Sequence, residues 1–229
     1  MTSSAVIIGS GGGIGGALAD LFDSDDAVTV YRLGRSEAIR LDLTDENSIA
    51  KAAEELSALR VTPALVVVAT GLLHRDGIGP EKSLRELDPE WMLENYRINA
   101  VGPALVAKHF LPLMPRNQRT VFAVLSARVG SISDNKLGGW YSYRASKAAL
   151  NMLIRNLAIE WQRKSAEAII VGLHPGTVET GLSAPFKGNP ATERFTPAKA
   201  AEQLLNVLDR LNPAQSGQVF AFDGDLIAP

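Results

Sequence analysis

Two tyrosines and a lysine lie close together in the segment GGWYSYRASKAALN, residues 138–151. Tyr143 and Lys147 are four residues apart, so a helix would place both side chains on one face. A free tyrosine has a pKa of ~10, and a lysine ammonium one turn away stabilises the phenolate and lowers that pKa. Tyr141 has only Ala145 at the same spacing. The spacing therefore predicts that Tyr143, assisted by Lys147, exchanges a proton with a ligand.

A serine hydroxyl is predicted to join this pair. Ser126 directly follows the apolar run Thr120–Leu125, which has the composition of a buried strand. Ligands of parallel sheets bind beyond the carboxyl ends of the strands, where this serine would lie. We therefore expect Ser126 to face the same ligand as Tyr143.

The glycine-rich segment AVIIGSGGGIGGALADLF reads as a strand, a turn and the start of an amphipathic helix. Glycines let backbone amides approach a diphosphate, and a helix N-terminus adds partial positive charge. Two registers fit a dinucleotide motif: Gly11, Gly13 and Gly16, or Gly9, Gly13 and Gly15. The second is favoured because the apolar strand ends just before Gly9. The alternative is a tight turn that binds no ligand.

The end of the next apolar strand, VYRLGRSE, indicates which dinucleotide would bind. Gly34 occupies the position where an acid would hydrogen-bond the ribose of NAD, and Arg32 and Arg35 lie nearby. Guanidinium groups suit a phosphate, so NADP is favoured and NAD remains an alternative. These arginines could instead be solvated. Asp42 would either hold the adenine amino group or cap a helix.

Short apolar segments alternate with helical patterns along the whole chain, as in a doubly wound α/β fold. This predicts one Rossmann-type domain over residues 1–229, with a parallel sheet of about seven strands covered by helices on both faces. Residues 181–195 read as a lid-like loop. The expected helices span 48–59, capped by Thr44 or Asp45; 89–114, with Pro89 at the first helical position after Asp88; 143–163; and 196–211, with Thr196 as its cap. The expected strands are Ala5–Ile8, Ala27–Tyr31, Ala64–Ala69, Thr120–Leu125, Ala168–Leu173 and Val219–Phe222.

The composition argues against several classes of partner. A formal net charge of −2 gives no electrostatic support for nucleic acid or a membrane surface. There are no cysteines, and His74, His109 and His174 show no metal-ligand spacing, so no metal site is expected. No segment approaches the roughly 20 apolar residues of a membrane span, and the N-terminal apolar run is too short for a signal peptide. We expect a cytoplasmic protein.

Several motifs in a fixed order resemble the short-chain dehydrogenase/reductase family. They are GSGGGIG (9–15), LDLTD (41–45), RINAVGP with Asn99, Ser126, YRASK (143–147) and HPGTVET (174–180). Within the family, SYRASKAALNM and the C-terminal SGQVFAFDGD are most similar to the C-factor-like, sniffer-type carbonyl reductases.

The resemblance implies four catalytic residues. Tyr143 would protonate a carbonyl oxygen as hydride arrives, and Lys147 would lower its pKa and hold the nicotinamide ribose. Ser126 would hydrogen-bond the substrate oxygen, and Asn99 would anchor a water that connects Lys147 to solvent. With Arg35 and Asp42 from above, the expected cofactor residues are Gly9, Ser10, Gly13, Ile14, Gly15, Arg35, Asp42, Leu43, Ala69, Gly71, Tyr143, Lys147, Pro175, Gly176, Val178 and Thr180.

The sequence departs from the family pattern at three places. Ile8 replaces the usual threonine before the first glycine, and VATG (68–71) replaces the family's Asn-Asn-Ala-Gly. The spacing from Ser126 to Tyr143 is longer than usual, which leaves Ser131 and Ser133 as alternatives to Ser126. The extra residues must loop out for Ser126 to reach the site.

The expected activity is NADP-preferring transfer of hydride between nicotinamide and a small carbonyl or alcohol substrate. The alternative is a dinucleotide-binding signalling or regulatory protein with little catalysis. Apolar residues beyond one face of the helices 89–114 and 143–163 fit self-association as a homodimer or homotetramer. Trp140 would line the substrate pocket or lie in the core. His174 is expected to brace the backbone rather than touch substrate.

Overall fold

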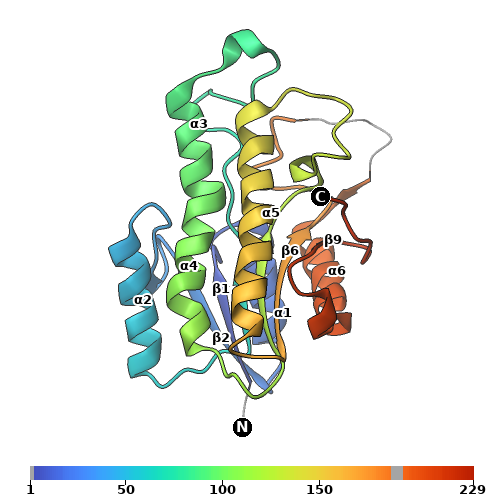
Figure 1. Cartoon of the computed structure of the whole chain (residues 1–229). Helices are drawn as coiled ribbons and strands as arrows, with labels where there is room; N and C mark the ends of the chain where they lie inside the picture. Colours follow the sequence, from blue (N-terminus) through green and yellow to red (C-terminus); the bar gives the residue numbers. More distant parts are fainter. Residues whose placement is uncertain (1–2, 187–192) are drawn as a thin grey trace.

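A parallel sheet forms the centre of the molecule (Figure 1). The computed structural model describes residues 3–186 and 193–229. The sheet has seven strands in the order β3-β2-β1-β4-β5-β6-β9. They are β1 Ser3–Ile8, β2 Val28–Gly34, β3 Ile39–Arg40, β4 Leu65–Val68, β5 Thr120–Leu125, β6 Ala168–His174 and β9 Val219–Ala221. The predicted Rossmann-type α/β fold is confirmed.

The central strands are valine- and isoleucine-rich because helices cover both of their faces. Every residue of β5 is buried, and all but the last residue of β6 are buried. The sequence pattern did not predict one strand, β3. At two residues, β3 is too short to give a periodic signal, yet it pairs with the end of β2 through Leu33 and Ile39. The prediction of about seven strands was therefore correct in number.

Helices divide between the two faces of the sheet (Figure 1). On one face, α2, α4 and α5 pack against a core that includes Leu56, Phe110 and Ile154. On the other face, α1 and α6 pack over a core that includes Leu18 and Leu204. The helices are α1 Gly13–Asp23, α2 Glu46–Ala58, α3 Pro89–Tyr96, α4 Gly102–Phe110, α5 Tyr141–Gln162 and α6 Pro197–Arg210. Short 3₁₀ turns are η1 Leu84–Glu86, η3 Leu111–Leu113, η4 Arg128–Gly130 and η5 Pro213–Gln215.

Three helices begin at the capping residues that their sequences suggest. The side chain of Asp45, rather than Thr44, accepts a hydrogen bond at the start of α2. Asp88 accepts from the Trp91 amide at the start of α3, and Thr196 accepts from the Lys199 amide at the start of α6. Each cap satisfies a first-turn donor that has no partner within its helix.

The expected helix 89–114 is interrupted. A π-helical turn, η2 Arg97–Val101, separates α3 from α4, and Asn99 lies within this turn. Such turns insert one extra residue and re-aim the side chains around it, and they occur often at functional sites. The helical periodicity of the sequence does not distinguish this turn from an α-helix.

The predicted loop 181–195 is partly ordered into a strand. Arg194 and Phe195 form β8, which pairs in parallel with β7, Thr177–Val178. The expectation of a wholly irregular loop was wrong at these two residues. Residues 187–192 of the expected lid lie outside the described residues.

The order of the strands creates a crevice at one edge of the sheet. From β1 the chain moves outward to β3, then crosses back to β4 and continues in the opposite direction to β9. The connections that leave β1 and β4 therefore diverge at the carboxyl ends of these neighbouring strands. Ligands of doubly wound folds bind at such a reversal.

Candidate functional site

A cavity of about 1120 Å³ lies beyond the carboxyl ends of the parallel strands. Its walls come from the segments that follow β1, β2, β4, β5 and β6, together with the start of α5. The glycine turn lies in one part of it, and Ser126, Tyr143 and Lys147 lie in another. The fold thus brings most of the predicted nucleotide residues, and three of the four predicted catalytic residues, into one cavity.

The glycine turn has a steric requirement for glycine at two positions. Gly9 has φ +87°, and a Cβ on it would lie 2.9 Å from the carbonyl oxygen of Ala69. A Cβ on Gly15 would overlap the carbonyl oxygen of Gly9, whereas one on Gly13 would meet Cγ2 of Thr180 at 2.7 Å, a side-chain atom that can move. This geometry agrees with the register that begins at Gly9.

The first turn of α1 has the features of an anion-binding site. Its N-cap residue, Gly12, is extended and offers no side-chain acceptor, and the first turn contains no acidic residue. Gly12, Gly13 and Ile14 line the cavity. The first amides of a helix have no partner within it and carry partial positive charge. They can therefore donate to a diphosphate.

Thr70 gives an independent indication of a polar ligand beside this turn. Its Oγ1 is shielded from solvent and has no hydrogen-bond partner among the described residues, although the residue lines the cavity. Its methyl group lies close to Gly9, 2.7 Å from where a Cβ would be. The backbone cradle and this unpaired hydroxyl fit a bound dinucleotide. Ser10 and Gly15 do not line the cavity and instead shape the turn from behind.

The region expected to bind adenosine contains charges of both signs. Arg35 and Asp42 line the cavity, as predicted, together with Leu43. Asp42 accepts hydrogen bonds from the amide and hydroxyl of Thr44, which lower its pKa. Asp45, not Asp42, caps the following helix.

Two residues in this region differ from the sequence-based expectation. The proposed contribution of Arg32 was wrong, because its guanidinium pairs with Asp20 and Asp23 on α1 and does not line the cavity. The pattern also missed Glu37, whose carboxylate accepts a 2.8 Å hydrogen bond from Ser10 Oγ and lines the cavity.

The catalytic candidates come together on α5 and at the end of β5. Tyr143 is 8% exposed, whereas Tyr141 is 37% exposed and does not line the cavity. The Lys147 ammonium donates a 2.8 Å hydrogen bond to the carbonyl of Leu125 and lies 5.8 Å from the centre of the Tyr143 ring. Lysine and tyrosine therefore lie on one face of α5, as their spacing predicts.

The expected effect of Lys147 on Tyr143 is not observed. Burial raises the pKa of Tyr143 to about 12 and lowers the pKa of Lys147 to about 7. In both groups burial penalises the charged form, so the phenol keeps its proton and the ammonium loses its proton more readily. The prediction that Lys147 lowers the pKa of Tyr143 is wrong for the chain as described.

Ser126 reaches the cavity despite its longer spacing from Tyr143. The added residues form the turn η4 and an irregular segment that leaves the site and returns to α5. The Ser126 hydroxyl donates a 2.5 Å hydrogen bond to the amide oxygen of Asn151, one helical turn beyond Lys147. Ser131 and Ser133 instead contact the carbonyl oxygen of Pro229, and neither lines the cavity. Ser126 is therefore the serine that faces the site.

Asn99 supports the cavity wall from behind. Its amide oxygen accepts from the Leu72 amide at 2.8 Å, and its Nδ2 donates to the Leu72 carbonyl at 2.9 Å. The same Nδ2 lies 3.1 Å from the hydroxyl of Ser146 on α5. Asn99 thus joins the segment after β4 to the catalytic helix, which supplies the bracing that the VATG segment lacks. Asn99 does not line the cavity itself.

The charged residues of the polar segment 74–87 are expected from the sequence to be solvated, but one of them, Glu81, holds the start of α5. Glu81 is 3% exposed, and its carboxylate accepts from both the amide and the hydroxyl of Ser142. Its carbonyl also accepts from the amide of Trp140, the N-cap residue, which has φ +53°. Glu81 therefore replaces the missing side-chain cap of α5, next to Tyr143.

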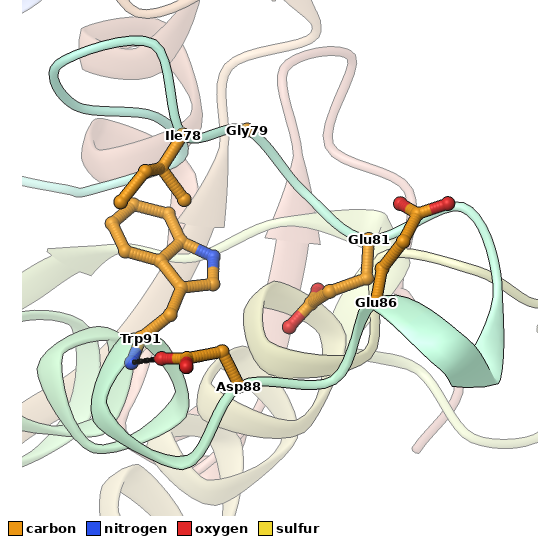
Figure 2. Close-up of a pocket in the computed structure, with 6 residues that line it drawn as sticks. All are labelled: Ile78, Gly79, Glu81, Glu86, Asp88 and Trp91. Carbon is orange, nitrogen blue, oxygen red and sulfur yellow. Dashed lines mark hydrogen bonds between the residues drawn. The ribbon is translucent and has the colours of Figure 1, made fainter.

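A smaller cavity of about 380 Å³ lies beside Glu81 and contains two further carboxylates (Figure 2). Both hold backbone groups in place: Glu86 accepts from the Lys82 amide, and Asp88 caps α3. Among residues 3–186 and 193–229, no group of three acidic, histidine or cysteine side chains could hold a metal ion. The acidic residues in this cavity therefore have structural roles.

Aromatic and apolar side chains form the wall opposite Tyr143. The Trp140 ring lies 6.2 Å from the Tyr143 ring and 5.4 Å from the Phe186 ring, between centres. Leu73 packs in the same cluster. The sequence allowed two positions for Trp140, in the substrate pocket or in the core. The structure places Trp140 in the cavity wall.

His174 also lines this part of the cavity. Its Nδ1 is shielded from solvent and has no hydrogen-bond partner among the described residues, so the expected backbone-bracing bond from this atom is absent. Burial lowers the pKa of His174 to about 4, and nearby Arg128 adds to the effect. The imidazole is therefore neutral at physiological pH.

The last group of predicted cofactor residues lies beyond β6. Pro175, Gly176, Val178 and Thr180 all line the cavity, as do Ala69 and Gly71 on the opposite side. Gly176 has φ +75°, and a Cβ on it would lie 2.9 Å from the Phe195 ring. The structure thus places these residues where a ligand could run from the glycine turn toward Tyr143.

Comparisons with known proteins agree with this arrangement. A family model described as enoyl-(acyl carrier protein) reductase matches residues 13–222. A 1-hydroxy-2-glutathionyl-2-methyl-3-butene dehydrogenase of a Rhodococcus species is 32% identical over 91% of this chain and 86% of its own. C-signal of Myxococcus xanthus is 34% identical over 62% of this chain and 81% of its own. The NADPH-bound carbonyl reductase from chicken fatty liver has a TM-score of 0.86 and 23% identity, covering 100% of this chain and 94% of its own.

No helix in the described parts of the chain has both the length and the apolar character needed to cross a membrane.

Proposed function

We propose that this chain, which belongs to the short-chain dehydrogenase/reductase family, reduces a carbonyl group with NADPH or oxidises the corresponding alcohol. The narrower likeness to the C-factor-like, sniffer-type carbonyl reductases is supported by the 34% identity to C-signal over 62% of this chain. One observation carries the proposal: Ser126, Tyr143 and Lys147 share a cavity with a turn in which the backbone leaves no room for a Cβ at Gly9 or Gly15.

A bound nicotinamide dinucleotide would supply or accept the hydride. The amides of Gly13 and Ile14 would bind its diphosphate, and Lys147 would contact its ribose. Ser126 would orient the substrate oxygen, held in place through its hydrogen bond to Asn151. Tyr143 would give this oxygen its proton.

Tyr143 is the proposed proton donor. Burial raises the pKa of Tyr143 to about 12, so the phenol carries its proton at neutral pH. It would give this proton to the carbonyl oxygen as hydride arrives. In the reverse oxidation the phenolate would take the proton back from the alcohol.

NADP preference is proposed from the residues around the adenosine region. Gly34 leaves no carboxylate at the end of β2, and Arg35 lines the cavity where a 2′-phosphate would be. Glu37 opposes this, because its carboxylate lies near Gly11 and would repel a phosphate. The ratio of NADP to NAD binding thus depends on the balance between Arg35 and Glu37.

Self-association as a homodimer or homotetramer is proposed from exposed apolar side chains on adjacent helices. Leu93 on α3 is 63% exposed, and Met152 on α5 is 62% exposed. Val101, at the end of the π-helical turn η2, and Ile159 on α5 are also exposed. Sedimentation velocity should give a dimer or larger species that Leu93→Asp together with Met152→Asp converts to monomer; an unaltered monomer would reject this proposal.

A second candidate function is a dinucleotide-binding signalling or regulatory protein. The similarity to C-signal favours it, since that relative is named for a signal rather than for an enzymatic activity. A pure sensor would need the glycine turn but not the grouping of Ser126, Tyr143 and Lys147. The presence of all three favours catalysis.

Cofactor titration followed by a carbonyl panel separates these functions. NADPH and NADH binding is measured first, and NADPH oxidation is then followed with aromatic and aliphatic aldehydes and ketones. We expect NADPH binding, turnover of at least one carbonyl, and a loss of about 1000-fold in kcat for Tyr143→Phe with cofactor binding retained. Failure to bind either cofactor would overturn the proposal. Binding without turnover, unchanged by Tyr143→Phe, would favour the signalling function.

A further inference from the structure

The substrate part of the cavity carries an excess of positive charge that comes from one segment. Arg128, Lys136 and Arg144 all line it, and all lie within or just after the extra residues between Ser126 and α5. The only acidic lining residue of this segment is Asp134, which lies 3.8 Å from Arg128. Three cations against one carboxylate leave a net charge of two.

Arg144 is fixed in place without a carboxylate partner. Its Nε donates to the carbonyl of Gly139 at 3.1 Å, and one terminal nitrogen donates to the carbonyl of Val129 at 3.3 Å. None of the described carboxylates lies within 4.0 Å of the charged nitrogens of Arg144 or Lys136, and Asp134 acts on Arg144 only from a greater distance. Arg144 follows Tyr143 on α5 and lines the same cavity.

Other cations along the cavity are already committed. Arg75 pairs with Glu94 on α3. Lys147 donates to the Leu125 carbonyl beside Tyr143. Arg35 lies with Glu37 and Asp42 in the adenosine region. The charge excess is therefore confined to the segment from Arg128 to Arg144.

Beside these cations lies an apolar surface. Leu73, Val129, Trp140 and Phe186 cluster around Tyr143 and bring no charge to the wall. A ligand whose carbonyl meets Tyr143 would thus place its body against rings and aliphatic side chains. Any group that extends past them toward solvent would meet Arg128, Lys136 and Arg144.

From this arrangement we infer that the substrate is a carbonyl compound with an apolar body and a carboxylate at its far end. Guanidinium groups bind carboxylates through paired, charge-assisted hydrogen bonds, and a cationic cleft mouth also steers anions toward it. This assignment rests on the proposed reductase activity, which it deepens by naming the class of substrate.

A matched pair of substrates tests the charge directly. para-Formylbenzoate and its methyl ester have the same ring and aldehyde and differ in one negative charge. We expect NADPH oxidation to show a kcat/KM about tenfold higher for the acid than for the ester, with the difference falling as salt is added.

The double variant Arg128→Gln with Lys136→Gln removes two exposed cations without touching the bonds of Arg144. It should lower kcat/KM for the acid about tenfold and change that for the ester less than about twofold. Lys51→Gln removes a charge from the exposed face of α2 and should change neither. Equal use of acid and ester by the natural chain, or an equal loss for both in the double variant, would overturn the inference.

Calorimetry separates this inference from the proposed function. Binding of para-formylbenzoate is measured in the presence of NADP⁺, where no hydride donor is present. Preferential binding of the acid, lost in the double variant, would uphold the carboxylate site even if no aldehyde is reduced. Reduction of the ester with no preference for the acid would uphold the reductase and reject the carboxylate site. Absence of both binding and turnover would reject both.

Discussion

The two parts of the cavity are built in different ways. The nucleotide part is made largely of backbone from one strand, turn and helix that are consecutive in sequence, Ser3–Ile8 to Gly13–Asp23. The substrate part is made of side chains from segments far apart in sequence, including Leu73, Trp140 and Phe186. A short local motif determines the backbone geometry of the nucleotide part. The side-chain wall of the substrate part forms only when the whole chain is folded.

Charge distinguishes the same two parts. In the adenosine region Arg35 faces two carboxylates, Glu37 and Asp42, whereas cations dominate around Arg128 and Arg144. A ligand that bridges the cavity therefore meets a mixed environment at one end and a positive one at the other. Perturbing one part should leave the other part intact if they are as separate as their construction suggests.

The largest difference between the effects on the two parts is expected when one methyl group is added to the glycine turn. Gly15→Ala would drive a Cβ into the Gly9 carbonyl, displace the turn and weaken NADPH binding by about 100-fold. Gly11→Ala is the matched control, because its Cβ would meet only the Glu37 carboxylate at 3.8 Å. Fluorescence titration with NADPH gives both affinities. Equal loss in the two variants would mean that the register beginning at Gly9 is incorrect.

The next perturbation addresses the substrate part through Glu81. Glu81→Ala leaves the Ser142 amide and hydroxyl without their buried acceptor, which should lower the free energy of unfolding by about 2 kcal/mol and kcat about tenfold. Glu81→Gln keeps an acceptor and should restore most of kcat. Glu86→Gln, in the same small cavity but exposed, serves as control. NADPH affinity that falls as much as kcat would contradict a role confined to α5.

The pH dependence of stability tests the burial of His174. The pKa of this imidazole is about 4 in the folded chain and 6.5 as its ordinary value. The unfolded chain therefore takes up a proton first as the pH falls, and stability is lost between pH 6.5 and pH 4. Between pH 7 and pH 5, titration of His174 should lower the free energy of unfolding by about 2 kcal/mol. Urea denaturation of His174→Asn should show a smaller loss over this range, and an unchanged pH slope would refute the assigned pKa.

The smallest effects are expected in the balance between two cofactors. Arg35→Gln should lower kcat/KM for NADPH about tenfold and leave NADH nearly unchanged, since only NADPH carries the 2′-phosphate. Glu37→Gln should raise the preference for NADPH about threefold by removing a repelling charge. Steady-state kinetics with one carbonyl substrate measures both ratios. A natural chain that prefers NADH would refute the role of Arg35 alone.

Patterns in the sequence predicted those parts that local geometry controls. The strand, turn and helix around Gly9, the face shared by Tyr143 and Lys147, and the caps at Asp88 and Thr196 all depend on neighbouring residues. These are the features for which a spacing rule has a direct steric or hydrogen-bonding cause.

The remaining features depend on contacts between distant residues, which no local pattern records. Glu81 sits in a polar loop segment but is buried because α5, 61 positions later, needs its carboxylate. The pKa of Tyr143 follows the apolar surroundings in the folded chain rather than Lys147 alone. Glu37 reaches the glycine turn only because β1 and β2 are paired in the sheet. The sequence alone does not show that Arg144 lines the cavity, because this depends on how the segment after Ser126 folds back to α5.

Transfer of a labelled hydride tests the central claim most directly. NADPH deuterated at both C4 positions is incubated with the protein and benzaldehyde, and the benzyl alcohol is analysed by mass spectrometry. We predict one deuterium on the former carbonyl carbon, and no labelled alcohol above background with Tyr143→Phe. Binding of NADPH without labelled alcohol across a panel of carbonyl compounds would contradict the assignment of this cavity as a reductase site.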